Sequence, residues 1–334
     1  MTTPALDAFV RRWWNHDFGA AGRLLDAALA PAEGLYRGAI AARNAAYARG
    51  MLRAERAGVP VISVGNIATG GTGKTPFSNW LARRLAARGE SPALLHGGYG
   101  SDEPELHRRW SPDIPVVVDR DRVRGAWQAC QQGATVLILD DGFQHRRLHR
   151  DLDLLLLSAE RWHDAARLLP RGPWREPRAA LGRADLIVCT RKTAPAGAAT
   201  RAAAEMSAAS SRPVVRAHLH AGAWLHAGAP AEAPEGPVLL VAALAEPAIF
   251  AENARAAGAD VADTMFFPDH HVYLDADADR IRQRASGRVV ATTEKDWTKL
   301  DALLDTQRVW LLAQTVEIED GAAALDEALT RVLS

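Results

Sequence analysis

Hydrophobic and polar residues alternate along the chain in a rhythm that predicts an α/β protein. Short apolar runs rich in Val, Ile and Leu are separated by stretches with helical periodicity, and they lie at 61–64, 92–95, 115–118, 135–139, 153–157 and 185–190. Buried strands that alternate with helices form a doubly wound, mostly parallel sheet. We therefore expect residues 58–212 to fold as one α/β/α sandwich.

A second α/β rhythm follows a polar, proline-rich stretch at 227–237. Apolar runs at 238–243, 264–267, 288–293 and 308–315 alternate with helical patterns, which predicts a smaller α/β domain over 238–334. Between the two domains, two short strand-like runs flank Ala221-Gly222. This arrangement predicts a β-hairpin linker over 213–237.

Residues 1–57 precede the first strand and contain a helical pattern from about 35 to 56. On that helix Tyr36, Ile40, Tyr47 and Met51 share one face, and arginines lie opposite. Tyrosines combined with arginines suit a helix that lies on an anionic membrane surface. An ordinary amphipathic helix packed on the domain explains the same pattern equally well.

Composition narrows the class of protein. A chain of 334 residues suggests two domains, and a net charge of zero gives no indication of a nucleic-acid partner. Cys130 and Cys189 are too few and too far apart for a disulfide framework or a zinc site. We expect no signal peptide and no membrane-spanning helix, because no uncharged apolar run approaches the length that a bilayer requires. Attachment to a membrane surface stays open.

A glycine-rich loop after the first strand is typical of nucleotide-binding proteins. It reads Ala68, Thr69, Gly70, Gly71, Thr72, Gly73, Lys74, Thr75, and an amphipathic helix follows. Such loops direct backbone N–H groups at phosphate oxygens, with the lysine on the β/γ-phosphates and the hydroxyl on Mg²⁺. One position departs from the usual pattern, because Ala68 stands where the first glycine is common.

Acidic residues follow two other strands. Asp140 and Asp141 end the run at 135–139, as a Walker B aspartate does, and could hold Mg²⁺ opposite Thr75. Asp102 and Glu103 occur in a predicted loop after the strand at 92–95, where acids can bind a metal or act as a base. The proline-broken loop at 169–177 carries Arg171 and Arg175, either of which could meet a phosphate.

Two stretches of the second domain also carry polar groups after strands: Phe266–Tyr273, which contains His270-His271, and Ala291–Asp296. No third ligand at a recognisable spacing accompanies the histidines, which argues against zinc. A histidine beside an aspartate is typical of a proton-handling pair. A helix-capping aspartate with a surface histidine is the competing interpretation.

Together these stretches resemble the tetraacyldisaccharide 4'-kinase family, the lipid A kinases of Gram-negative bacteria. The matching segments occur in the family's order and are Val64–Pro76, Gly98–Gly100, Asp102–Pro104, Asp140–Arg147, Gly172–Pro177, Phe267–His271 and Thr293–Asp296. The resemblance implies transfer of the ATP γ-phosphoryl group to the 4'-hydroxyl of a tetraacyldisaccharide 1-phosphate, a lipid A precursor. It further implies two α/β/α domains joined by a β-stranded linker. The N-terminal helix would touch the inner membrane from the cytoplasmic side. The protein would thus be a peripheral membrane protein, and we expect no nucleic-acid partner and no obligate protein partner.

The resemblance also assigns roles to single residues. Asp102 falls on the family's proposed catalytic aspartate and His270 on its paired histidine, while Glu103, Asp140 and Asp141 fall on the acidic positions around Mg²⁺–ATP. Arg175 and Gln144, inside matched motifs, become candidates for contact with phosphate or substrate.

Two departures affect this assignment. The segment between Gly100 and Asp102 is shortened and has Ser101 where the motif has glycine. His96 and Gly97 stand where Ser-Arg is common, which implies that an arginine contact is missing.

Other functions use similar loops. A nucleotide-driven switch of the partitioning or metal-insertion type is one alternative, although Thr69 stands where partitioning ATPases carry a signature lysine. A soluble small-molecule kinase or an ATP-dependent ligase is another. ATP turnover that does not depend on lipid would favour either alternative.

Overall fold

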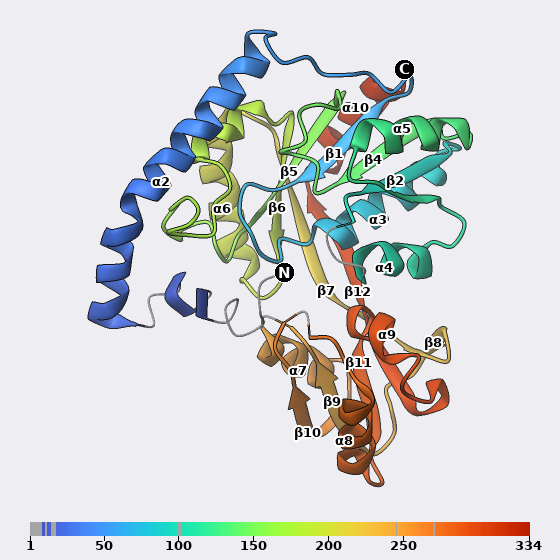
Figure 1. The fold of residues 1–334 in the computed structure, drawn as a ribbon. Coiled ribbons are helices and arrows are strands. Elements are labelled where there is room, and N and C mark those ends of the chain that lie inside the picture. Colours follow the sequence, from blue (N-terminus) through green and yellow to red (C-terminus); the bar gives the residue numbers. More distant parts are fainter. Residues whose placement is uncertain (1–8, 11, 15–17, 99–101, 245, 270) are drawn as a thin grey trace. The chain divides into compact units, whose positions relative to one another are not determined.

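The computed structural model describes residues 9–10, 12–14, 18–98, 102–244, 246–269 and 271–334. The chain forms two compact units (Figure 1). The larger contains Arg12–His218 and Val316–Ser334, and the smaller contains Leu219–Thr315. The segment predicted as a C-terminal domain thus returns to the larger unit for its last residues.

A parallel sheet forms the centre of the larger unit, as predicted. Its strands are β1 (Val61–Gly65), β2 (Pro92–His96), β3 (Val116–Val118), β4 (Val136–Asp140), β5 (Leu152–Ser158), β6 (Leu186–Arg191) and, up to His218, β7 (Val214–His226). They lie in the order β7-β6-β5-β1-β4-β2-β3. Since the chain moves outward from β1 to β3 and then returns to β4, β1 and β4 lie where the strand order reverses. Ligands of such sheets bind beyond the carboxyl ends of the strands at that point.

Helices cover both faces of this sheet. They are α3 (Lys74–Ala86), α4 (Asp102–Trp110), α5 (Arg122–Gln131), α6 (Ala196–Ser210) and α10 (Ala322–Leu333), with a 3₁₀ helix η1 at Arg178–Arg183. Helix α3 connects β1 to β2 and helix α5 connects β3 to β4, so the chain crosses the sheet in opposite directions at these two helices. Right-handed crossovers therefore place α3 and α5 on opposite faces. Arg84 of α3 pairs with Asp326 of α10 at 2.7 Å, which fixes the final helix beside α3.

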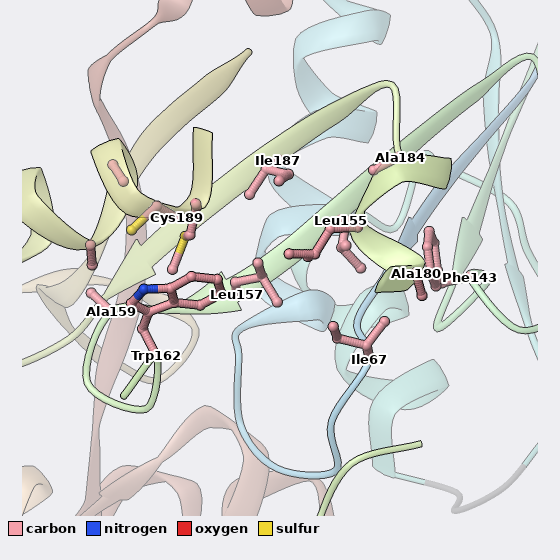
Figure 2. Close-up of a cluster of buried hydrophobic side chains, with 14 of the residues drawn as sticks. Ile67, Phe143, Leu155, Leu157, Ala159, Trp162, Ala180, Ala184, Ile187 and Cys189 are labelled. Carbon is pink, nitrogen blue, oxygen red and sulfur yellow. The ribbon is translucent and has the colours of Figure 1, made fainter. Parts of the chain in front are cut away.

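Core residues reach from the strands into the loops that follow them. Figure 2 shows Ile67, from the loop after β1, and Phe143, from the loop after β4, in one cluster with Leu155 and Leu157 of β5. A Cβ atom on Gly65 would lie 2.6 Å from the Cβ of Phe143, so only glycine allows these loops to approach so closely. The loops at the carboxyl edge of the sheet are therefore anchored by apolar packing.

The N-terminal helix α2 spans Gly19–Ala48 (Figure 1). The prediction of a helix over 35–56 was wrong at both ends. The helix begins earlier because the alanine-rich start favours helix and Pro31 is accommodated inside it. It ends earlier because Gly50 takes a left-handed conformation, with φ 71°. Among the described residues, no helix has the length and apolar character needed to span a bilayer.

The smaller unit has its own parallel strands, in the order β10-β9-β11-β12. These are β9 (Pro237–Ala242), β10 (Asp260–Phe266), β11 (Val289–Thr293) and, up to Thr315, β12 (Val309–Asp320). Helices α7 (Pro247–Ala256), α8 (Asp275–Ala285) and α9 (Glu294–Leu300) and the 3₁₀ helix η2 (Thr306–Arg308) accompany them. The second α/β rhythm of the sequence is thus confirmed.

The predicted turn at Ala221-Gly222 was wrong, because β7 runs without interruption from Val214 to His226. The hairpin turn lies instead at Ala227-Gly228, with φ 50° and 82°, and leads into β8 (Ala229–Ala231). Gly222 has a packing role, since a side chain there would overlap Thr315.

Candidate nucleotide and phosphoryl-transfer site

The predicted phosphate loop connects β1 to α3 and lies at the carboxyl edge of the sheet. Gly70 and Gly73 take left-handed conformations, with φ 119° and 81°, and Lys74 is the first residue of α3. Asn66 donates to the Thr72 hydroxyl at 3.1 Å. Backbone N–H groups at the start of α3 therefore face the place where a phosphate would bind.

Position 68, occupied by Ala68, does not require a glycine. It forms an antiparallel bridge with Trp174, and the neighbouring Thr69 N–H donates to the carbonyl of Pro173 at 2.7 Å. The backbone is therefore extended at this position and accepts a Cβ atom. The departure from the common motif leaves the loop intact, because the loop at 169–177 supports its first half.

Asp141 is the centre of an ion cluster. Its backbone is left-handed, with φ 54°, and its carboxylate lies 3.7 Å from Lys74 Nζ. Arg175 Nη1 donates to both oxygens of this carboxylate, at 2.9 and 2.8 Å. Burial acts to raise the pKa of Asp141, but Lys74 and Arg175 outweigh burial and hold the pKa below its usual value.

Asp140, the last residue of β4, is fully enclosed. Ser78 Oγ lies 3.1 Å from its Oδ1, and His107 Nε2 lies 3.0 Å from its Oδ2. Burial acts to raise the pKa of Asp140, yet the hydrogen bond and charge of His107 keep the pKa low. The two adjacent aspartates thus have different surroundings: Asp140 is held by neighbouring helices, and Asp141 by cations.

The sequence predicted that Asp102 and Glu103 lie in a loop. In the structure they are instead the first two residues of α4. The acids of its first turn and the basic residues of its last turn complement the helix dipole. Asp102 is buried, and Glu103 Oε2 lies 2.9 Å from His96 Nε2. The structure therefore places Glu103 beside His96, the last residue of β2. The strand paired with β2 is β4, which ends at Asp140.

Gly97 follows His96 and is covered by an arginine from elsewhere in the chain. A Cβ atom at this position would overlap the guanidinium of Arg122, the first residue of α5. Arg122 is buried, and its Nη1 donates to the carbonyl of Asp119 at 2.7 Å. The Arg122 guanidinium therefore occupies the space directly over Gly97.

Arg175 and Gln144 lie together beside the phosphate loop. Arg175 Nη1 lies 3.4 Å from Gln144 Oε1, and Gln144 Nε2 donates to the carbonyl of Asn66 at 2.9 Å. Helix α2 reaches the same place, since the Tyr36 hydroxyl donates to the carbonyl of Arg175 at 3.0 Å. Asn44 of α2 also donates to Glu176, at 2.9 Å.

The candidate metal ligands are the Thr75 hydroxyl and the carboxylates of Glu103, Asp140 and Asp141. All four supply oxygen, the donor that Mg²⁺ prefers. Mg²⁺ typically uses only one or two carboxylates and completes its shell with phosphate and water. Asp141, which is partly exposed beside the phosphate loop, fits this requirement, whereas both oxygens of Asp140 already accept hydrogen bonds.

In the smaller unit, His270 lies outside the described residues, so its role stays a prediction. The adjacent His271 is committed to packing: it stacks on Phe267 with ring centroids 4.6 Å apart and lies 2.9 Å from Asp277. Asp296 is buried and accepts from the Ala243 N–H at 3.0 Å. These two motif residues therefore hold loops of the smaller unit together.

Sequence reasoning did not select Ser78 or His107 as residues of the site. Ser78 lies one helical turn after Thr75 but carried no motif of its own. His107 belongs to α4, which was not predicted, and it meets Asp140 only through the packing of that helix.

Comparisons with known proteins agree with this geometry. The model of a family described as tetraacyldisaccharide-1-P 4'-kinase matches residues 25–334. A tetraacyldisaccharide 4'-kinase of Anaeromyxobacter dehalogenans strain 2CP-C is 39% identical, over 95% of this chain and 93% of the relative. One of Geobacter sulfurreducens is 37% identical, over 96% and 97%. A crystal structure of LpxK from Aquifex aeolicus, described as an apo form in complex with ATP, has a TM-score of 0.75 and 29% identity, and covers 93% of this chain and all of the relative.

Proposed function

Because this chain belongs to the tetraacyldisaccharide-1-P 4'-kinase family, we propose that it transfers the γ-phosphoryl group of ATP to the 4'-hydroxyl of a tetraacyldisaccharide 1-phosphate. The observation that carries the proposal is the cluster of Lys74, Asp141 and Arg175 at the mouth of the phosphate loop. It combines two cations for phosphate oxygens with one carboxylate for a metal. This combination serves phosphoryl transfer, whose catalysis depends on positioning and charge neutralisation.

In this proposal the chain holds the nucleotide through the loop Ala68–Thr75. Backbone N–H groups of the loop bind the β-phosphate, and Lys74 lies at the boundary between the β- and γ-phosphates. Arg175, which already faces Lys74 across Asp141, binds γ-phosphate oxygens as charge develops on them. Gln144 orients Arg175 through its side-chain oxygen.

Thr75 and Asp141 are the residues that would hold Mg²⁺, with Glu103 nearby on α4. When bound, Mg²⁺ neutralises phosphate charge during the transfer. Asp102, at the start of α4, accepts the proton of the attacking sugar hydroxyl. Its buried position suits a base, because a carboxylate screened from water keeps a stronger interaction with the hydroxyl.

The surface of helix α2 supports our proposal that the protein binds the cytoplasmic face of the inner membrane. Leu24 and Leu35 are 75% and 78% exposed. They lie three helical turns apart, on the same side of α2. Glu33 and Asn44, which bond to the rest of the unit, point the other way. An exposed apolar stripe backed by a docked polar face suits a helix that rests on lipid.

The direct test is a phosphoryl-transfer assay. Wild-type protein, Mg²⁺, γ-labelled ATP and the tetraacyldisaccharide 1-phosphate are incubated in detergent micelles, and label is measured in the lipid fraction. We expect label with wild type and loss of at least about 100-fold with Lys74→Ala, since one phosphate donor contributes about that much. The matched control is Arg83→Ala, an exposed cation on the same helix, which should retain activity.

Two results would contradict the proposal. Label that never enters a verified lipid substrate would exclude the kinase. ATP hydrolysis that proceeds at the same rate with and without lipid would favour a nucleotide-driven switch or a kinase for a soluble substrate.

A further inference from the structure

The carboxylate of Asp140 is held from two sides by residues of different helices. Ser78 of α3 contacts Oδ1 at 3.1 Å, and His107 of α4 contacts Oδ2 at 3.0 Å. All three side chains are inaccessible to solvent, with relative exposures of 0%, 0% and 1% for Ser78, His107 and Asp140. No water competes for these hydrogen bonds, so they determine how the carboxylate is oriented.

His107 contacts Asp140 through one ring nitrogen, Nε2. Its Nδ1 is buried and has no hydrogen-bond partner among the residues that the structure describes. Nε2 is therefore the atom through which His107 holds Asp140, and the imidazole ring packs near Trp110, with ring centroids 6.2 Å apart.

Asp140 consequently links three segments that carry site residues. Helix α3 begins with Lys74, helix α4 begins with Asp102 and Glu103, and Asp141 follows directly on the chain. Loss of the His107 hydrogen bond would free one carboxylate oxygen and separate α4 from the end of β4. The positions of Glu103 and Asp141 relative to each other depend on this contact.

We propose that His107 is a positioning residue of phosphoryl transfer: it orients Asp140 and so fixes the acidic groups that receive the metal–nucleotide complex. This inference rests on the proposed function. Residues that orient a metal-binding group typically contribute about 10- to 100-fold to metal affinity or activity. His107 touches neither substrate nor reacting atoms and acts through Asp140.

Three substitutions test this role. His107→Leu removes the donor, His107→Gln keeps an N–H at nearly the same reach, and Leu106→Ala weakens the same helix at a buried neighbour without touching Asp140. Binding of Mn²⁺ with a non-hydrolysable ATP analogue, thermal unfolding, kcat and the KM for ATP are measured for each. Ser78→Ala, which removes the other donor, is the second variant should His107→Leu fail to fold.

We expect His107→Leu to weaken Mn²⁺–nucleotide binding and to lower kcat by at least about 10-fold. His107→Gln should recover most of both, and Leu106→Ala should lose stability while keeping kcat and metal binding. Unchanged binding and kcat in His107→Leu would overturn the proposal, as would equal losses in His107→Leu and Leu106→Ala. If wild type binds Mn²⁺–nucleotide but phosphorylates no lipid, the proposed function fails, and the binding series still decides the role of His107.

Discussion

Arg175 donates through a single nitrogen, Nη1, to both carboxylate oxygens of Asp141. The second arginine of the same loop is engaged elsewhere, since Arg171 pairs with Glu33 of α2 at 2.8 Å. The sequence left open which of the two would meet a phosphate. The structure brings Arg175 to the phosphate loop and places Arg171 against α2.

Replacement of Arg175 should therefore affect catalysis. We expect Arg175→Ala to lower kcat by about 100-fold or more, because one cation that stabilises developing charge is lost. Arg175→Lys should recover only part of the rate, since an ammonium cannot reproduce the guanidinium geometry. Arg171→Ala is the matched control and should change stability but leave kcat within about 3-fold; equal effects on kcat would refute the distinction.

Asp102→Asn should separate chemistry from nucleotide binding. General-base catalysis contributes about 10²- to 10⁴-fold, so kcat should fall within that range while the affinity for ATP stays nearly constant. Glu105→Gln, on the same helix, is the control. Steady-state kinetics with a separate ATP-binding measurement will decide, and near-wild-type turnover in Asp102→Asn would remove this residue from the base role.

His145 should give the protein an acid-sensitive stability. Burial, followed by the charge of Arg122, lowers its pKa to about 4. The unfolded state, with an ordinary histidine pKa near about 6.5, binds the proton more readily, so stability should fall as pH drops from about 6.5 towards 4. The decline in melting temperature over this window should be shallower in His145→Asn than in wild type. The substitution His163→Asn, at an exposed histidine, is measured in parallel as the matched control.

The exposed leucines of α2 should determine membrane binding. Leu24→Glu combined with Leu35→Glu should reduce co-flotation with vesicles that contain anionic lipid, because two apolar contacts become charges. Trp127→Glu, which removes an exposed apolar side chain on α5, should float like wild type. Equal flotation of all three proteins would exclude α2 as the lipid-binding surface.

Local patterns in the sequence were sufficient to predict the sheet and the nucleotide loop. A strand, a glycine-rich turn and Lys74 are neighbours along the chain, and the pair Asp140-Asp141 ends a strand. The contact between His107 and Asp140 joins residues 33 positions apart. This contact depends on how α4 packs against the sheet, and the periodicity of the sequence does not predict that packing.

Turns and helix ends were predicted less well, for a related reason. Ala221-Gly222 and Ala227-Gly228 are the same dipeptide, yet only the second adopts positive φ angles. The first lies inside a strand, where Thr315 leaves no space for a side chain. Likewise, the alanines of α2 favour a helix but carry too little hydrophobic contrast to mark where it begins.

The guanidinium over Gly97 has a consequence for substitutions at this position. A Cβ atom at position 97 would overlap the Arg122 guanidinium, so the end of that side chain would have to move. The guanidinium is the far end of a flexible side chain, so it moves more easily than backbone would. That movement would take Arg122 away from the Asp119 carbonyl, so the size of residue 97 and the position of the Arg122 guanidinium are linked.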